Sequence, residues 1–286
     1  MTHFCAPDLW GKRALAGAFA LCAALATAGC ETVGAVGSRG SSIAELEQPT
    51  DSTSTNLEAL SEVVKSHPDR PDAYITRGVS YARIGRYSEA VADFSVAIKL
   101  DPGNVAAYTN RALAYRQQNR NDAALGDFNH AIEVNPQHAA AYLGRANLLR
   151  AQGGFEQALG DLDQAIKLNP ESAQAFHARG LIYQRQGDNV RAITDFDNAI
   201  DRDPFAAAPY QARGQSLIAV GKPAPAIEDF NSALNVDNRN GDAWAGLGLA
   251  YERTGNRPKA AESYQRALSI SPQNQVAREG QSRVRS

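Results

Sequence analysis

The chain has 286 residues, of which 43% are hydrophobic and 21% charged, and its formal net charge is -2. This near-neutral balance gives no electrostatic reason to bind nucleic acid, whose affinity for proteins comes mostly from neutralised phosphates. The three cysteines lie at positions 5, 22 and 30, which excludes a disulfide framework, a thiolate metal site and a cysteine nucleophile from the rest of the chain.

The N-terminus has the pattern of an export signal. Lys12 and Arg13 precede an uncharged run over residues 14–29 that is rich in Ala and Leu. Basic residues, a short apolar stretch and then small residues are typical of a secretory signal. The run is also shorter than the roughly 20 residues that a membrane-spanning helix needs. We therefore expect residues 1–29 to be a signal peptide and the protein to be exported.

The end of this run offers two cleavage sites. Residues 25–30 are Leu-Ala-Thr-Ala-Gly-Cys and resemble a bacterial lipobox, although Thr27 departs from the usual leucine. The resemblance implies lipidation at Cys30 and an anchor in the bacterial envelope. Glu31 replaces the aspartate of the inner-membrane retention signal, which favours the outer membrane, facing the periplasm. The alternative is cleavage after Ala28, which would leave a soluble periplasmic protein.

Two further segments precede the main part of the chain. Residues 30–55 are rich in Gly, Ser and Thr and lack apolar periodicity, which predicts a flexible tether. Residues 56–70 match only the second half of the repeat described next, with Leu60, Val63 and Pro68 in register. We expect them to form an N-terminal capping helix.

The rest of the chain repeats every 34 residues. Prolines stand at positions 68, 102, 136, 170, 204 and 272, and Asn238 takes the one missing place. Self-similarity at such a period indicates a solenoid of stacked units. The six repeats are 71–104, 105–138, 139–172, 173–206, 207–240 and 241–274. Residues 275–286 remain as a polar C-terminal cap or tail.

Within each repeat, a few positions keep their character. Position 8 is always Gly or Ala, positions 20 and 27 are always Ala, and position 24 is Phe, Tyr or Leu. Position 4 is aromatic in Tyr74, Tyr108, Tyr142, Phe176, Tyr210 and Trp244. These positions share helix faces at helical spacing, and Gly or Asn119 at position 15 suits the residue that closes a helix. The pattern resembles the tetratricopeptide repeat (TPR), which implies an all-α, right-handed superhelical solenoid of six helical hairpins.

Two polar positions vary together. Position 7 is Arg in repeats one to five, and position 23 is Asp in the same repeats; in the sixth they become Leu247 and Ser263. Their joint loss predicts that they contact each other in a ladder of ion pairs. The sequence leaves open whether each arginine pairs within its own repeat or with the preceding one.

The resemblance also implies a binding surface. In the TPR family, positions 2, 5, 9, 12 and 13 of the first helix line a concave groove. The candidate groove residues here are Arg83, Leu113, Arg116, Asn147, Arg150, Leu181, Gln184, Arg185 and Gln215. A mixed lining of arginine and apolar residues suits an acidic or amphipathic segment of a partner protein. The alternative interpretation is a solvated helix face. The chaperone-tail carboxylate clamp of some TPR proteins is rejected, because only Asn110 matches its pattern.

The sequence favours a protein without catalytic activity. Its histidines have no metal-ligand spacing, and it contains no phosphate-binding glycine loop, nucleophile elbow or H-E-x-x-H motif. We therefore predict no catalytic residues, no cofactor and no nucleic-acid partner. The chain resembles bacterial TPR lipoproteins, which implies a scaffold or adaptor that binds other envelope proteins and is held at the membrane by a lipid anchor. The alternatives are a pilotin-like lipoprotein for pilus or secretin assembly and an accessory subunit of an enzyme complex.

Overall fold

The computed structural model describes residues 52–285. The signal peptide, Cys30 and most of the predicted tether therefore lie outside the described residues. Within the described part the chain is entirely helical, with helices α1 to α14 and no strand. No helix in this part has both the length and the apolar character that a bilayer span requires.

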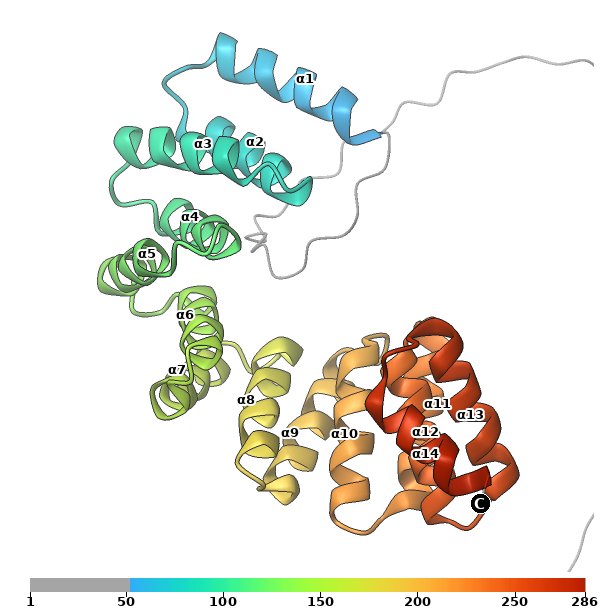
Figure 1. Ribbon diagram of the computed structural model, residues 1–286. Helices are drawn as coiled ribbons and strands as arrows, with labels where there is room; N and C mark the ends of the chain where they lie inside the picture. Colours follow the sequence, from blue (N-terminus) through green and yellow to red (C-terminus); the bar gives the residue numbers. More distant parts are fainter. Residues whose placement is uncertain (1–51, 286) are drawn as a thin grey trace, which may run out of the picture. The chain divides into compact units, whose positions relative to one another are not determined.

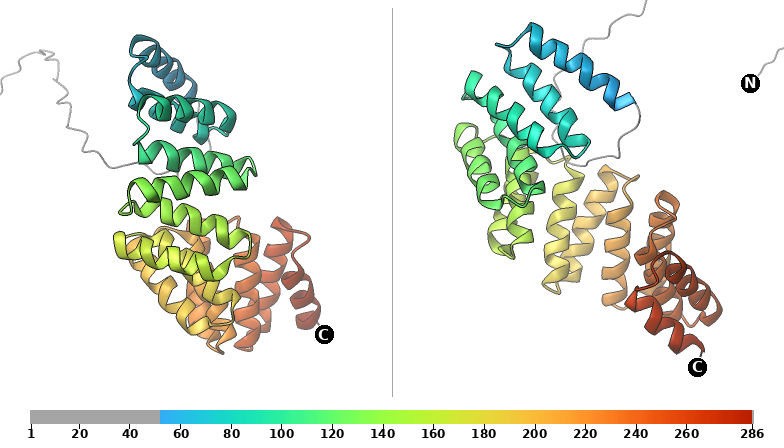
Figure 2. Two further views of the ribbon diagram at one scale, coloured as in Figure 1. Left: turned by 90° about the vertical axis from the view of Figure 1, so that its left-hand side faces the viewer. Right: turned by 45° about the horizontal axis from the view of Figure 1, so that its top comes forward.

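Six helical hairpins form the body of the protein, as predicted (Figure 1). They pair α2 (Pro71–Arg83) with α3 (Tyr87–Leu100), α4 (Val105–Gln117) with α5 (Asn121–Val134), α6 (Ala139–Ala151) with α7 (Phe155–Leu168), α8 (Ala173–Arg185) with α9 (Asn189–Arg202), α10 (Ala207–Ala219) with α11 (Pro223–Val236), and α12 (Gly241–Arg253) with α13 (Arg257–Ile270). Each hairpin packs on the next in chain order, which Figure 2 shows from two further sides.

In each hairpin the first helix is closed by the residue at position 15, as the sequence predicted. Asn119 and the five glycines at position 15 all have positive φ, from 58° at Asn119 to 84° at Gly153. Only Gly, and less often Asn, adopts this left-handed conformation at little cost. Pro223 begins α11, where a missing N–H breaks no helical hydrogen bond. The 34-residue pattern therefore fixes both helices of each repeat.

A buried side chain at position 24 joins each hairpin to the next. The rings of Phe94, Phe128, Phe196, Phe230 and Tyr264 are fully buried. Where position 8 of the same repeat is glycine, the ring lies directly against it: a Cβ atom added to Gly180 would lie 2.6 Å from Cε1 of Phe196. The third repeat has Ala146 at position 8 and carries the smaller Leu162 in place of the ring. The small residue at position 8 thus leaves room for the buried side chain at position 24.

The loops between repeats explain why Asn238 can replace proline. Trp244 at position 4 donates its indole N–H to the carbonyl of Asn238 at 3.0 Å, and the Tyr74 hydroxyl donates to the carbonyl of Pro68 at 3.2 Å. The partner is a backbone carbonyl, which both residue types supply.

Single helices cover the two ends of the array. Helix α1 (Ser52–Ser66) packs on α2 and begins at Ser52 rather than at residue 56, so it includes the last residues of the predicted tether. Helix α14 (Gln275–Arg285) packs on α12 and α13. Arg283 of α14 donates to both carboxylate oxygens of Glu252, at 2.7 and 3.0 Å. Both ends of the solenoid are therefore covered by a helix rather than left as open hairpin faces.

Candidate functional site

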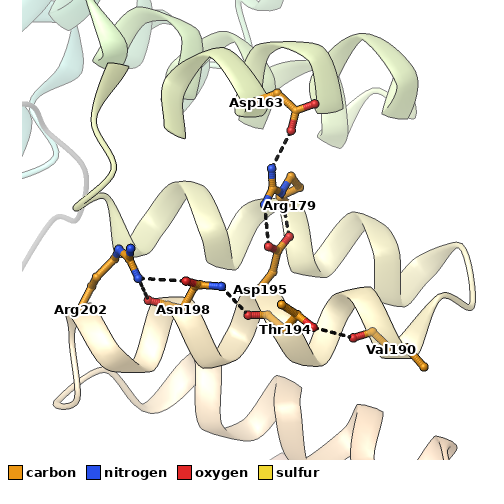
Figure 3. Close-up of polar contacts among 7 residues, drawn as sticks. All are labelled: Asp163, Arg179, Val190, Thr194, Asp195, Asn198 and Arg202. Carbon is orange, nitrogen blue, oxygen red and sulfur yellow. Dashed lines mark hydrogen bonds and ion pairs between the residues drawn. The ribbon is translucent and has the colours of Figure 1, made fainter. Parts of the chain in front are cut away.

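The arginines at position 7 belong to the structure of the repeats. Arg179 donates from Nε and Nη2 to the two carboxylate oxygens of Asp195, at 2.8 and 2.7 Å, and from Nη1 to Asp163 at 2.7 Å (Figure 3). Asp195 lies in the second helix of the same repeat, and Asp163 lies in the repeat before. Each arginine of the ladder therefore joins two consecutive repeats, which answers the question that the sequence left open.

All five repeats share this arrangement. The bidentate pairs are Arg77–Asp93, Arg111–Asp127, Arg145–Asp161, Arg179–Asp195 and Arg213–Asp229. The Nη1 donor of each arginine reaches the preceding helical unit, which is the capping helix α1 for Arg77 and the preceding repeat for the other four. The acceptors are Ser61, Ser95, Asn129, Asp163 and Asp197. The hydrogen bonds that each arginine donates to its aspartate raise the pKa of the arginine, so these charges are held inside the fold and are not offered to a ligand.

The arginines at position 12 have the opposite environment. Arg116 and Arg150 are half-buried and lie in α4 and α6. Nε of Arg150 is shielded from solvent and has no hydrogen-bond partner. Burial, and then repulsion from Arg150, lowers the pKa of Arg116. Neither guanidinium has an ion-pair partner among the described residues, so two cations face each other without a neutralising anion.

His177 of α8, in the next repeat, lies close to Arg150. Burial lowers the pKa of its imidazole to about 4, and the charge of Arg150 lowers it further in the same direction. Its ring lies against Phe196, with ring centroids 5.8 Å apart. At neutral pH the imidazole beside Arg150 is therefore neutral and adds no positive charge to that of the two arginines.

A cavity of about 280 Å³ adjoins Arg150. Its walls include Phe155 and Leu181, and Arg185 lies at its edge with its guanidinium 5.3 Å from the centre of the Phe155 ring. Apolar and cationic groups thus lie side by side. This is the combination that an acidic, amphipathic segment would complement.

The remaining predicted groove residues are dispersed. Leu113 is only 9% exposed and packs in the core around Phe128. Gln184 donates its amide to the Ala212 carbonyl and to the Ser216 hydroxyl, both at 2.9 Å, and so connects its repeat to the next one. Asn147 is half-buried, and Gln215 is exposed.

Arg83 lies at a second, larger cavity near the N-terminal end, together with residues that the sequence analysis did not single out. One of these is His138. Position 34 carries Asn104, Ser172 and Asn240, which cap the helix that follows, whereas His138 and Ala206 at the same position do not. A histidine at a capping position is an exception that the repeat pattern does not explain. Among the described residues no group of His, Cys, Asp and Glu could hold a metal ion.

Comparison with known proteins places these features in a family. Models of the tetratricopeptide repeat match residues 105–138, 143–207 and 212–275, and a further TPR model matches residues 80–119. None of the curated proteins matches the sequence.

Several solved structures share the fold. A chain of the APC/C hetero-tetramer Cut9-Hcn1 is 20% identical with a TM-score of 0.71; the match covers 82% of this chain and 46% of that one, so this chain spans less than half of it. PilW, a widely conserved type IV pilus biogenesis factor, is 19% identical with a TM-score of 0.65, covering 73% of this chain and 97% of PilW. YrrB, a TPR protein with an unusual peptide-binding site, is 22% identical with a TM-score of 0.57, covering 66% of this chain and 97% of YrrB. At these identities the likeness concerns the fold alone.

Proposed function

Because the chain belongs to the tetratricopeptide repeat family, we propose that it is a non-catalytic scaffold that binds acidic segments of other proteins on the concave side of its first helices. One observation carries the proposal: Arg116 and Arg150 lie close enough to repel each other, and Nε of Arg150 is buried without a partner. A buried polar group without a hydrogen bond is costly, and the fold itself makes no use of these two charges.

A carboxylate is the ligand that best satisfies this pair. Guanidinium groups offer several donors in a fixed plane, and carboxylates accept two of them at once. The apolar wall of Phe155 and Leu181 beside Arg150 would hold a hydrophobic side chain next to the acidic one. A partner segment with an acidic residue and a neighbouring apolar residue therefore fits the surface.

Affinity capture tests the proposal. We expect the double variant Arg116→Met/Arg150→Met to lose at least about tenfold in capture of partner proteins from envelope extracts, a change of about 1.4 kcal/mol. The matched control is Arg239→Met/Arg257→Met, which removes the same charge from two exposed positions and should capture as the wild type does. Added salt should weaken wild-type capture more than that of the groove variant. Equal capture by both double variants would show that the arginines are only a solvated face.

We further propose that the protein works in the bacterial envelope, exported and anchored by lipid on Cys30. The support is the sequence of residues 12–30 alone. Cys30→Ala should abolish labelling by a fatty acid and release the protein to the soluble periplasm. A wild-type protein whose mature N-terminus is an unlabelled Gly29 would support the alternative of a soluble periplasmic scaffold.

A role in pilus assembly is the second candidate, favoured by the likeness to PilW, which covers nearly the whole of that protein. In a strain that carries type IV pilus genes, deletion of the gene should reduce surface pili seen by electron microscopy, and the wild-type copy should restore them. Unchanged pili would leave the general scaffold as the proposed function.

A further inference from the structure

The larger of the two cavities described above is lined by residues of α1, α2, α4 and α6 and has a volume of about 560 Å³. We call it the N-terminal cavity. Leu60 of α1, together with Ile75 and Val79 of α2, forms its apolar wall. A cavity of this size is in the range of ordinary ligand sites, and the capping helix α1 supplies part of its lining.

The polar part of the N-terminal cavity carries a positive charge and no negative one. Arg83, in the last turn of α2, is exposed and makes no hydrogen bond or ion pair with any described residue. None of the residues that line the cavity is an aspartate or a glutamate. Asn110 of α4 is only 3% exposed, yet its side chain makes no hydrogen bond to any described residue. The cavity therefore offers unused donors to an anion beside an aliphatic surface.

A segment with the complementary chemistry stands directly before α1 in the sequence. Residues 43–47 are Ile-Ala-Glu-Leu-Glu, which combine two large aliphatic side chains with two carboxylates. No other stretch of five residues between positions 30 and 51 has this combination. The segment lies outside the described residues, so its relation to the cavity is argued here from its sequence and from the place where α1 begins.

The connection is short enough to bring this segment to the cavity. Helix α1 begins at Ser52, and Asn56, near its start, also lines the cavity. Four residues of helix rise by about 6 Å, whereas the five residues from Glu47 to Ser52 can span up to about 17 Å when extended. A connection of this length holds the segment at an effective concentration in the millimolar range.

We propose that residues 43–47 bind in the N-terminal cavity of their own chain, with their acidic side chains facing Arg83 and their aliphatic side chains packed on the apolar wall. A single ion pair at an exposed arginine is weak, so the aliphatic contacts and the short connection supply the rest of the affinity. A partner that reaches Arg83 has to displace this segment. The cavity includes neither Arg116 nor Arg150, so the inference does not rest on the proposed function.

Fluorescence anisotropy tests the inference with a labelled peptide of residues 42–48. The parent protein is the chain from residue 30 onward with Cys30→Ser, which keeps the preparation free of lipid. In the quadruple variant Ile43→Ser/Glu45→Gln/Leu46→Ser/Glu47→Gln the cavity is free, and the peptide should bind with a Kd of about 100 μM. It should bind the parent at least about tenfold more weakly, because a segment held at about 1 mM competes with it.

Exposed charges elsewhere provide the matched controls. Glu156→Gln/Glu228→Gln removes two exposed carboxylates outside the segment and should bind the peptide as weakly as the parent does. Added to the quadruple variant, Arg83→Gln should weaken peptide binding at least about fivefold. Arg239→Gln, at another exposed arginine, should leave the binding unchanged.

His138 reports directly whether the cavity is occupied, because it belongs to the lining. Its imidazole resonances in NMR spectra, assigned with His138→Gln, should differ between the parent and the quadruple variant. Saturating peptide should move the resonances of the variant towards those of the parent. The difference should not depend on protein concentration, since the contact is made within one chain.

Three results would each overturn the inference. Equal binding of the peptide to the parent and to the quadruple variant would mean that the cavity is free in the parent, and its occupant would then be another protein. The same holds if the quadruple variant does not bind the peptide at all. A His138 difference that grows with protein concentration would assign the segment to the cavity of a second copy.

Discussion

Arginines at positions 7 and 12 lie on the same helices, and comparing them shows what the repeats do with charge. In α6, Arg145 donates to Asp161 at 2.8 and 2.7 Å and to Asn129 at 2.8 Å. Arg150, five residues further along, has a buried Nε without a partner. Five residues turn a helix by about 140° beyond a full circle, so the two arginines point to different sides of α6, and Arg145 is the one that reaches Asp161 in the second helix of its hairpin.

Both residues are arginines, so the residue type alone does not reveal their roles. The hydrogen-bond partners of each guanidinium do. The ladder arginines are satisfied by the repeat that carries them and by the one before. Arg116 and Arg150 at position 12 are half-buried, and repulsion from Arg150 adds to the effect of burial in lowering the pKa of Arg116. Substitutions at the two positions should therefore differ in their effect on the free energy of unfolding.

Arg179→Met should be the most damaging change. It leaves the carboxylate of Asp195, only 4% exposed, without its counter-ion, and removing one partner of a buried pair typically costs about 3–5 kcal/mol. Urea unfolding followed by far-ultraviolet circular dichroism measures the loss. A variant that unfolds at the wild-type midpoint would mean that the ladder is no more than a surface feature.

His177 should contribute to the pH dependence of the free energy of unfolding. Its folded pKa of about 4 lies below its ordinary value of 6.5, so the unfolded chain takes up a proton that the folded chain refuses. The stabilisation is complete above about pH 6.5 and is lost as pH falls towards 4, by up to about 3 kcal/mol. His177→Phe should therefore unfold with a weaker dependence on pH in this window.

The matched control for this measurement is His67→Gln, because His67 is exposed beyond the end of α1. It should follow the wild-type curve. If His177→Phe also follows that curve, the imidazole is not held neutral by its surroundings, and water reaches His177 more readily than its burial indicates.

The sixth repeat suggests a double-mutant cycle for the ladder. There Leu247 is buried and the Ser263 hydroxyl donates to the Lys259 carbonyl at 2.8 Å. Arg213→Leu alone strands Asp229, but Arg213→Leu/Asp229→Ser copies the sixth repeat. Replacing both members of a buried pair is often nearly neutral, so the double variant should lie within about 1 kcal/mol of the wild type. A double variant as unstable as the single one would assign the ladder a net stabilising role.

Much of this arrangement could be predicted from the sequence, because the repeats are built from local contacts. Positions 8 and 24 meet within one hairpin, so their small and large residues show the packing without coordinates. In the sixth repeat both ladder positions change together, to Leu247 and Ser263, and this joint change was enough to predict that the two positions pair. The second partner of each ladder arginine could not be predicted, because the residue at position 25 of the preceding repeat changes along the chain, from Ser95 to Asn129 to Asp163.

The candidate site was harder to predict for the same physical reason. Whether a residue at position 9 or 12 faces solvent depends on how the next repeat packs on it. Leu113 lies in the core, and Gln184 is bonded to the following repeat, although helical geometry alone pointed both away from their hairpin. His138 lies in a loop, where no helical period applies, and its side chain does not cap α6.

Arg150→Met should have the smallest effect on stability and is the most direct counterpart of Arg179→Met. Both changes remove a guanidinium from a partly buried helix position and leave an unbranched apolar side chain of similar length. In α8, Arg179→Met leaves the buried carboxylate of Asp195 without its counter-ion. In α6, Arg150→Met removes a buried Nε that has no partner and relieves the repulsion on Arg116. We therefore expect Arg150→Met to unfold within about 0.5 kcal/mol of the wild type, or at a slightly higher urea concentration. A loss as large as that of Arg179→Met would show that Arg150 has a structural partner. The charges of Arg116 and Arg150 would then stabilise the fold, and the proposal of an acidic partner would lose its main support.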